Sequence, residues 1–277
     1  MTADSLLIIA ALGFVLAIPF VAAELYERAE MFKPTREHAL TPSDVGLPPP
    51  REMFIDSGGA KLYSWFFQTS PSATTLLYVH GNAGNMADRL RVIKGYLSLG
   101  LNVFIYDPRG YGKSEGVATP DNFIRDALSA YSHLVDKSGV HPSQIVVLGQ
   151  SLGGIAALRL VNGVKCRGLI LEGAFASVRW LARDRFPNLP VWVFVLPRLD
   201  NEREIRKLSV PVLLISGALD DTIPPRHSKL LFESAPEPRE LLVVDGAAHS
   251  DMYSVAPELY YGAIGRFVKQ QASDAVS

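Results

Sequence analysis

The chain of 277 residues has a single cysteine, Cys166. One thiol cannot form an intramolecular disulfide or a multi-cysteine metal site, which excludes a fold held together by disulfides. The chain also lacks an excess of basic residues, since its formal net charge is -1, and no Lys/Arg cluster alternates with aromatic side chains. The balance of charge therefore argues against nucleic acid as a partner.

Charged residues are absent from the apolar segment at residues 5–23. An α-helix of this length is roughly 28 Å long, close to the thickness of the hydrocarbon core of a bilayer. We therefore expect residues 1–34 to be an N-terminal membrane anchor with a single transmembrane helix. A cleaved signal peptide and a helix in a soluble core are the alternatives, but the preceding MTADS has no Lys or Arg, contrary to the usual signal peptide.

Two further features follow the apolar segment. Arg28, Lys33 and Arg36 come after it and no basic residue precedes it, so the positive-inside rule places the rest of the chain in the cytoplasm. Residues 35–50, TREHALTPSDVGLPPP, are polar and end in three prolines, which cannot continue a helix. This composition predicts a linker, followed by a catalytic domain at residues 51–277.

Apolar runs of strand length recur along the predicted domain. The segments EMFID and KLYSWFF predict an opening hairpin around SGG, and the segments between later runs have the apolar spacing of helices. This alternation predicts an α/β fold with a mostly parallel sheet, whose ligand site lies at the carboxyl ends of the strands. Six runs rich in Val, Ile and Leu are typical of parallel strands that are buried on both faces: residues 75–79, 102–106, 145–149, 168–172, 212–216 and 241–244.

One serine stands where a strand run meets a helical pattern, in the motif Gly149-Gln150-Ser151-Leu152-Gly153. A nucleophile on such a sharp turn has a strained backbone, so the residues two before it and two after it must be very small. Gly149 and Gly153 meet this requirement. The context favours Ser151 as a nucleophile over a glycine-rich turn that only joins two elements.

A serine hydroxyl needs a base within hydrogen-bond distance and a third group that orients the base. His249, one of six histidines, follows the last strand run and precedes the C-terminal helical pattern, so we predict it as the base. Asp220 and Asp221 follow the run at residues 212–216, and Glu172 ends the run before that. Asp220 is the predicted orienting acid, and Asp221 and Glu172 are the alternatives.

The loop HGNAGN, residues 80–85, follows another strand run. Negative charge on a tetrahedral intermediate is stabilised by preorganised N–H donors. Leu152, directly after the nucleophile, offers one backbone N–H. The second is predicted from Asn82, with Ala83 as the alternative, because glycines such as Gly81 let the backbone turn its amides inward. The histidine that opens the loop is expected to brace it by hydrogen bonds.

The blocks VHGNAGN, YDPRGYGKSEG, GQSLGG, SGALDDTIPP and GAAHSD together resemble the α/β-hydrolase superfamily, over about residues 51–268. They are most similar to its membrane-associated α/β-hydrolase domain-containing serine hydrolases, a branch that includes protein depalmitoylases and lipid esterases. The resemblance implies a mostly parallel eight-stranded sheet flanked by helices, and a triad in the chain order Ser151, Asp220, His249. It also favours Asp220 over Asp221 as the acid.

An insertion at about residues 173–208 stands where this superfamily has its lid. Its centre, LPVWVFVLP, is apolar without a polar face, which favours lining an acyl pocket or contacting the bilayer; a helix buried against the core is the alternative. With the anchor, the lid predicts a serine hydrolase that cleaves a carboxylic ester or thioester of a lipophilic acyl group, in a small molecule or an acylated protein. A serine peptidase of the same fold and a catalytically idle membrane scaffold are the alternatives.

Neither a metal nor a cofactor is predicted. Asp220, Asp221 and His249 fit a catalytic triad better than a metal site. The other histidines are scattered along the sequence and form no set of metal ligands. The GQSLGG segment lacks the lysine of a phosphate-binding loop and the spacing of a dinucleotide-binding fingerprint.

Overall fold

The computed structural model describes residues 31–193 and 199–273. The predicted transmembrane helix, residues 5–23, lies outside this part of the chain. Within the described residues, no helix combines the length and apolar character that crossing a membrane requires. The membrane anchor therefore stays a prediction from the sequence.

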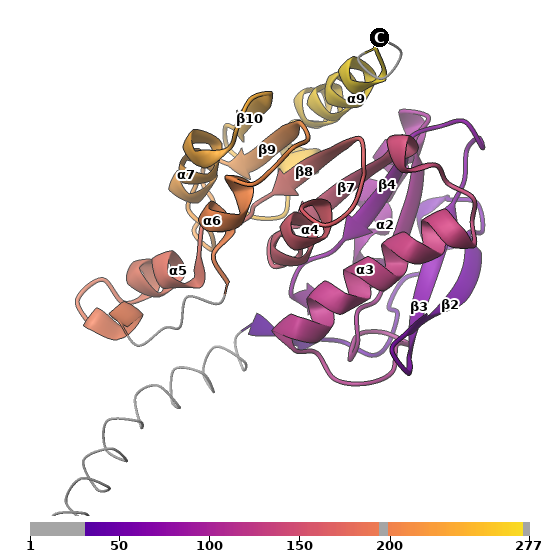
Figure 1. The fold of residues 1–277 in the computed structure, drawn as a ribbon, viewed down its shortest axis with the longest axis horizontal. Helices are drawn as coiled ribbons and strands as arrows, with labels where there is room; N and C mark the ends of the chain where they lie inside the picture. The colour runs from indigo at the N-terminus through magenta and orange to yellow at the C-terminus, as the bar shows by residue number, and fades with distance from the viewer. Residues whose placement is uncertain (1–30, 194–198, 274–277) are drawn as a thin grey trace, which may run out of the picture.

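A sheet of eight strands forms the centre of the described chain, in the order β10-β9-β8-β7-β4-β6-β3-β2 (Figure 1). The opening hairpin pairs β2 (Arg51–Ser57) with β3 (Ala60–Phe67), and β3 is also antiparallel to β6 (Asn102–Tyr106). The mostly parallel eight-stranded sheet is confirmed, and each predicted run falls within a strand. The other strands pair in parallel: β4 (Thr75–Val79), β7 (Ile145–Gln150), β8 (Gly168–Glu172), β9 (Val212–Gly217) and β10 (Arg239–Val244).

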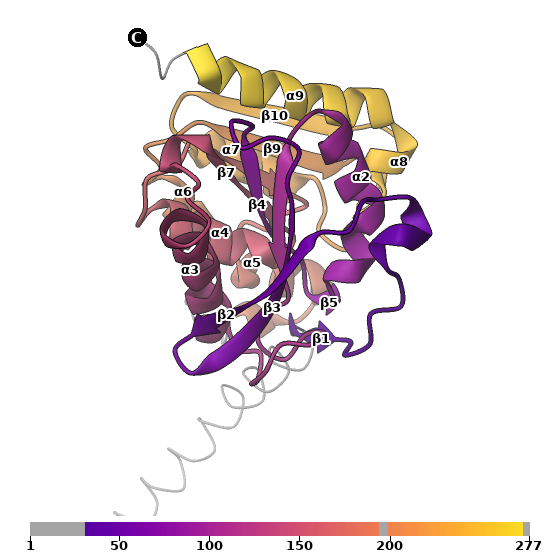
Figure 2. The same cartoon turned by 90° about the vertical axis from the view of Figure 1, so that its right-hand side faces the viewer.

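Helices cover both faces of this sheet (Figure 2). Consecutive strand residues point to opposite faces, so Leu77 of β4 packs in one apolar core and its neighbour Tyr78 packs in the other. Both faces need apolar residues, which explains why the strand runs lack polar alternation. The core of Leu77 includes residues of α3 (Pro120–Asp136), α4 (Gly153–Val161), α6 (Asn201–Ile205) and α7 (Arg226–Ser234), and that of Tyr78 includes α2 (Leu90–Ser98), α8 (Met252–Val255) and α9 (Pro257–Ser273).

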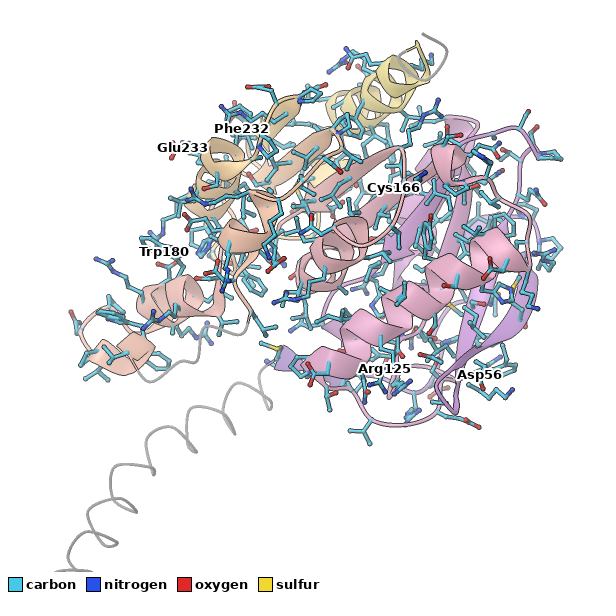
Figure 3. The ribbon with its side chains drawn as sticks, viewed as in Figure 1. Asp56, Arg125, Cys166, Trp180, Phe232 and Glu233 are labelled. Atoms are coloured by element: carbon cyan, nitrogen blue, oxygen red, sulfur yellow. The ribbon has the colours of Figure 1, made fainter. Side chains whose placement is uncertain are left out.

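The predicted lid leaves the sheet after β8, at the carboxyl ends of the strands. It contains α5 (Val178–Arg185) and the 3-10 helix η4 (Pro190–Val193), followed by α6. The part formed by α5 and η4 projects from the body of the domain (Figure 1), and Trp180 marks α5 on this projection in Figure 3. Residues 194–198, within the apolar centre of the lid, lie outside the described residues.

Residues 35–50, the predicted linker, lie against the domain. They contain the 3-10 helix η1 (Pro42–Val45), and the side chain of Leu47 is buried in the same core as Tyr78. His38 Nε2 lies 2.7 Å from Asp107 Oδ2, so this segment is also joined to the domain by a polar contact. The boundaries between anchor, linker and domain stay predictions, but the packed residues begin well before residue 51.

Candidate active site

Ser151 lies at the sharp turn between β7 and α4. Its φ of 52° is the only positive φ among the non-glycine residues that the structure describes. An L-residue is strained in this left-handed region, so the surrounding structure must hold it there. Two backbone hydrogen bonds do so: Ser151 N–H donates to Glu172 O over 2.7 Å, and Gly154 N–H donates to Ser151 O over 3.0 Å.

Three glycines lie where another backbone or side chain approaches the Ser151 turn. A Cβ on Gly153 would stand 2.1 Å from Val79 O, and a Cβ on Gly149 would stand 2.6 Å from the Cβ of Ala157. A Cβ on Gly81 would stand 3.3 Å from the Cβ of Ser151. The loop after β4 therefore packs directly against the serine, and the turn has no room for side chains on either side.

His249 lies between Ser151 and Asp220. Its Nε2 is 3.0 Å from Ser151 Oγ, and its Nδ1 is 2.7 Å from Asp220 Oδ2. The second oxygen of Asp220, Oδ1, accepts the backbone N–H groups of Thr222 at 3.0 Å and Ile223 at 2.8 Å. Because a carboxylate oxygen accepts, Nδ1 of His249 carries the proton of its hydrogen bond with Asp220, which leaves Nε2 as an acceptor for the serine hydroxyl.

The three side chains differ in access to solvent. The Asp220 side chain is 0% exposed, whereas that of His249 is 19% exposed. They come from loops at the carboxyl ends of different strands: Ser151 after β7, Asp220 after β9 and His249 after β10. The fold thus brings together, at one edge of the sheet, residues up to 98 positions apart in the sequence.

The two alternative acids occupy other surroundings. Asp221 is exposed, and its Oδ1 accepts a hydrogen bond of 3.4 Å from Thr222 Oγ1. Glu172 is buried, and its carboxyl accepts hydrogen bonds from Gln150 Nε2 at 3.0 Å and from the Tyr260 hydroxyl. Of the three acidic candidates, Asp220 is the one that is hydrogen-bonded to His249 in this geometry.

Glu172, whose backbone oxygen accepts the Ser151 N–H, belongs to a buried chain of polar side chains. Sequence patterns did not predict this chain. The Tyr260 hydroxyl contacts Glu172 and also lies 2.5 Å from the Tyr96 hydroxyl. Burial raises the pKa of Glu172, more than its hydrogen bonds from Tyr260 and Gln150 lower it. Glu172 was recognisable in the sequence as an acidic residue at the end of a strand run. Nothing in the local sequence indicates that Tyr260 of α9 is its partner.

The predicted donors to an oxyanion come from two sides, the serine turn itself and the loop after β4. Leu152 directly follows the serine and precedes α4, so its N–H belongs to the helix end where amides lack intrahelical acceptors and carry a positive dipole. Asn82 and Ala83 lie in the loop that packs on the serine turn. Arg89 joins the two sides, because its Nε donates to Gln150 Oε1 at 3.2 Å and its Nη2 donates to Ala83 O at 3.1 Å.

Comparisons with known proteins agree with this architecture. The "Alpha/beta hydrolase domain-containing protein WAV2" of Arabidopsis thaliana is 31% identical over 264 residues, which cover 87% of this chain and 85% of that protein. The chain belongs to the α/β-hydrolase superfamily. A second relative, the "Uncharacterized membrane protein YNL320W" of Saccharomyces cerevisiae, is 33% identical over 207 residues, or 73% of each chain. The resemblance carried by the sequence blocks is thereby confirmed at the level of the superfamily.

Two further comparisons agree with this assignment. A family described as "Serine aminopeptidase, S33" matches residues 70–200, which include the loop after β4 and the Ser151 turn. Among solved structures, the esterase Pf2001 of Pyrococcus furiosus has a TM-score of 0.72 at 24% identity and covers 86% of this chain and 98% of its own. At this identity the likeness shows the α/β-hydrolase fold.

Proposed function

We propose that this chain is a serine hydrolase that cleaves a carboxylic ester or thioester of a lipophilic acyl group. The observation that carries the proposal is the hydrogen-bonded series Ser151, His249, Asp220, with the serine on a strained turn. A serine, a base and an orienting carboxylate in this order are the geometry that activates a hydroxyl near neutral pH.

The reaction proceeds in two steps through an acyl-enzyme. Ser151 Oγ attacks the acyl carbonyl carbon while His249 Nε2 takes the hydroxyl proton, and the carbonyl oxygen becomes an oxyanion. The intermediate collapses, the bond to the leaving oxygen or sulfur breaks, and His249 gives its proton to the leaving alkoxide or thiolate. Water then attacks the acyl-enzyme with the same base, which releases the acid and restores Ser151.

Asp220 and the backbone amides stabilise the charges that form. The Asp220 carboxylate, fixed by the N–H groups of Thr222 and Ile223, orients His249 and stabilises the imidazolium. The N–H groups of Leu152 and of Asn82, or Ala83 in its place, are the donors to the oxyanion. One such donor contributes about 3 kcal/mol to transition-state stabilisation in other serine hydrolases.

The lid supports a lipophilic acyl group. Leu189, Trp192 and Val193 at its tip are 57%, 39% and 47% exposed, although each is a large apolar side chain. Exposed apolar residues on such a lid are typical of a surface that meets an acyl chain or a lipid interface. The apolar segment at residues 5–23 supports membrane attachment of the enzyme, with the catalytic domain in the cytoplasm and an acylated protein or a membrane lipid as substrate.

A serine peptidase is the second candidate, because the matching family is described as a serine aminopeptidase. The two candidates differ in the bond that is cleaved. An amide has a poorer leaving group than an ester, so a peptidase should cleave both kinds of bond, whereas an esterase should leave amides intact.

The test measures hydrolysis by the full-length chain in detergent micelles. The substrates are p-nitrophenyl acetate, octanoate and palmitate and, for the peptidase, aminoacyl p-nitroanilides. The proposal expects a higher kcat/KM for octanoate or palmitate than for acetate, no anilide cleavage, and loss of all activity in Ser151→Ala. A preference for acetate would contradict the lipophilic substrate, and rapid Ser151-dependent anilide cleavage would favour the peptidase.

A further inference from the structure

A short segment before the domain, residues 33–38, runs along the loop at residues 80–85. We call this segment the strap. Its strand β1 (Lys33–Pro34) pairs in parallel with β5 (Ala83–Gly84) in the loop. Lys33 N–H donates to Asn82 O and Thr35 N–H donates to Gly84 O, each over 3.0 Å. The strap therefore contacts the stretch of loop that contains the predicted oxyanion donors.

The strap is held firmly against the domain along its length. Thr35 O accepts the backbone N–H of Gly112 over 2.9 Å. The side-chain amide of Asn85, itself in the loop, donates to Thr35 Oγ1 at 2.8 Å and to Glu37 O at 2.6 Å. At the end of the strap, His38 contacts the buried carboxylate of Asp107, whose other oxygen accepts a backbone N–H of the segment after the loop. These contacts make the strap part of the packed structure around the loop.

Two hydrogen bonds converge on one carbonyl of the loop. Asn82 O accepts Lys33 N–H from the strap and also the hydroxyl of the buried Tyr111, over 2.7 Å. In a trans peptide, the C=O and the N–H lie in one plane and point in opposite directions. Asn82 O shares its peptide with Ala83 N–H, so the two donors that fix this carbonyl also fix the direction of that N–H.

The preceding peptide is fixed in the same way. His80 Nδ1 lies 2.8 Å from Gly81 O, and because a carbonyl only accepts, Nδ1 carries the proton of this hydrogen bond. Gly81 O shares its peptide with Asn82 N–H, the first predicted loop donor to the oxyanion. Both candidate donors thus belong to peptides whose carbonyl oxygens accept hydrogen bonds from other parts of the structure.

We propose that the strap and Tyr111 are positioning elements of the oxyanion hole, a role that rests on the proposed hydrolase function. They act through the loop and do not touch the substrate. An oxyanion donor is effective only when it points at the place where charge develops. A loosely held Asn82–Ala83 peptide therefore reduces the stabilisation of the transition state more than it reduces the binding of the substrate. The residues where the predicted anchor meets the predicted linker are therefore part of the catalytic apparatus and not a passive tether.

The test uses the full-length chain in detergent micelles with p-nitrophenyl octanoate. Tyr111→Phe removes one donor to Asn82 O and keeps the ring. Lys33→Pro removes the other, since proline has no N–H, and is compared with Lys33→Ala, which keeps it. Tyr106→Phe is the control, because the hydroxyl of this buried tyrosine has no hydrogen-bond partner in the described structure.

The expected result is a fall in kcat of about tenfold for Tyr111→Phe and for Lys33→Pro relative to Lys33→Ala, with less than about twofold change in KM. Inhibition by a trifluoromethyl ketone with an octanoyl-like chain, which forms an oxyanion on Ser151, should weaken by the same factor as kcat. Tyr106→Phe should leave both values unchanged.

The role of the strap is overturned if Tyr111→Phe keeps the wild-type kcat and the wild-type ketone affinity. Tyr111→Phe decides the question even if Lys33→Pro does not fold, which thermal unfolding of each variant reveals. Failure of the proposed hydrolase function has a different signature, because the wild-type chain would then show no Ser151-dependent hydrolysis at all.

Discussion

Asp220 holds His249 from a fixed position. Its Oδ2 lies 2.7 Å from His249 Nδ1, while its Oδ1 accepts two backbone N–H groups from the turn that follows it. The carboxylate cannot rotate away without losing those two amides. It is therefore placed to keep one tautomer and one orientation of the imidazole throughout the reaction.

Replacing Asp220 with Asn should lower kcat by about 10³- to 10⁴-fold, because an amide that donates to His249 favours the wrong tautomer. Asp221→Asn is the matched control, since Asp221 is exposed and contacts Thr222. It should change kcat by less than about twofold. Hydrolysis of p-nitrophenyl octanoate by both variants checks this, and equal losses in the two would contradict the assignment of Asp220.

Gly153, two residues after the serine, is predicted to be indispensable for packing. A Cβ on Gly153 would stand 2.1 Å from a backbone oxygen, so Gly153→Ala should lower the free energy of unfolding by more than about 3 kcal/mol or prevent folding. A Cβ on Gly163, which closely follows the same helix, would stand 3.6 Å from its nearest neighbour. Thermal unfolding should therefore show Gly163→Ala close to the wild type, and a similar loss in both would refute the close approach.

Glu172 should make stability depend on pH. Burial raises its folded pKa above the value in the unfolded chain, so its contribution is present below the unfolded pKa and is lost as pH rises through the folded pKa. Glu172→Gln has no carboxyl to ionise. The Tm of Glu172→Gln minus that of the wild type should thus increase as the pH rises above the ordinary pKa of a glutamate, and a constant difference would show that Glu172 does not titrate in this way.

The lid tip should contribute to acyl-chain preference. The double variant Leu189→Ser with Trp192→Ser replaces two exposed apolar side chains of the lid. It should lower kcat/KM for palmitate by at least about fivefold more than for acetate, because only the long chain loses apolar contact. Leu128→Ser, on the exposed side of α3, is the control for loss of an exposed leucine. Equal effects on both substrates would remove the lid tip from the acyl site.

The strands and the serine turn could be predicted because their signals are local. Residues 75–79 and 145–149 are short, continuous apolar runs, and a sheet that is covered on both faces needs such runs. The glycines around Ser151 are likewise dictated by the turn itself. Loops at the carboxyl ends of parallel strands lie at one edge of the sheet, which is why Ser151, Asp220 and His249 could be grouped before any geometry was known.

The surroundings of the site could not be predicted, because they depend on contacts between distant parts of the chain. Tyr260 reaches Glu172 across 88 positions of sequence, and Tyr111 reaches Asn82 O across 29. Nothing in the local pattern around either tyrosine indicates its partner. Residues 35–50 were expected to be a linker for the same reason: their polar, proline-rich composition hides the fact that His38 meets the buried Asp107.

The central claim, that Ser151 is the nucleophile of a serine hydrolase, is tested most directly by covalent labelling with a fluorophosphonate probe. The full-length chain should react to one probe per molecule, mass spectrometry should place the adduct on Ser151, and Ser151→Ala should not react. No reaction of the well-folded wild-type chain, or labelling that persists in Ser151→Ala, would contradict the claim and would favour a catalytically idle scaffold or another nucleophile.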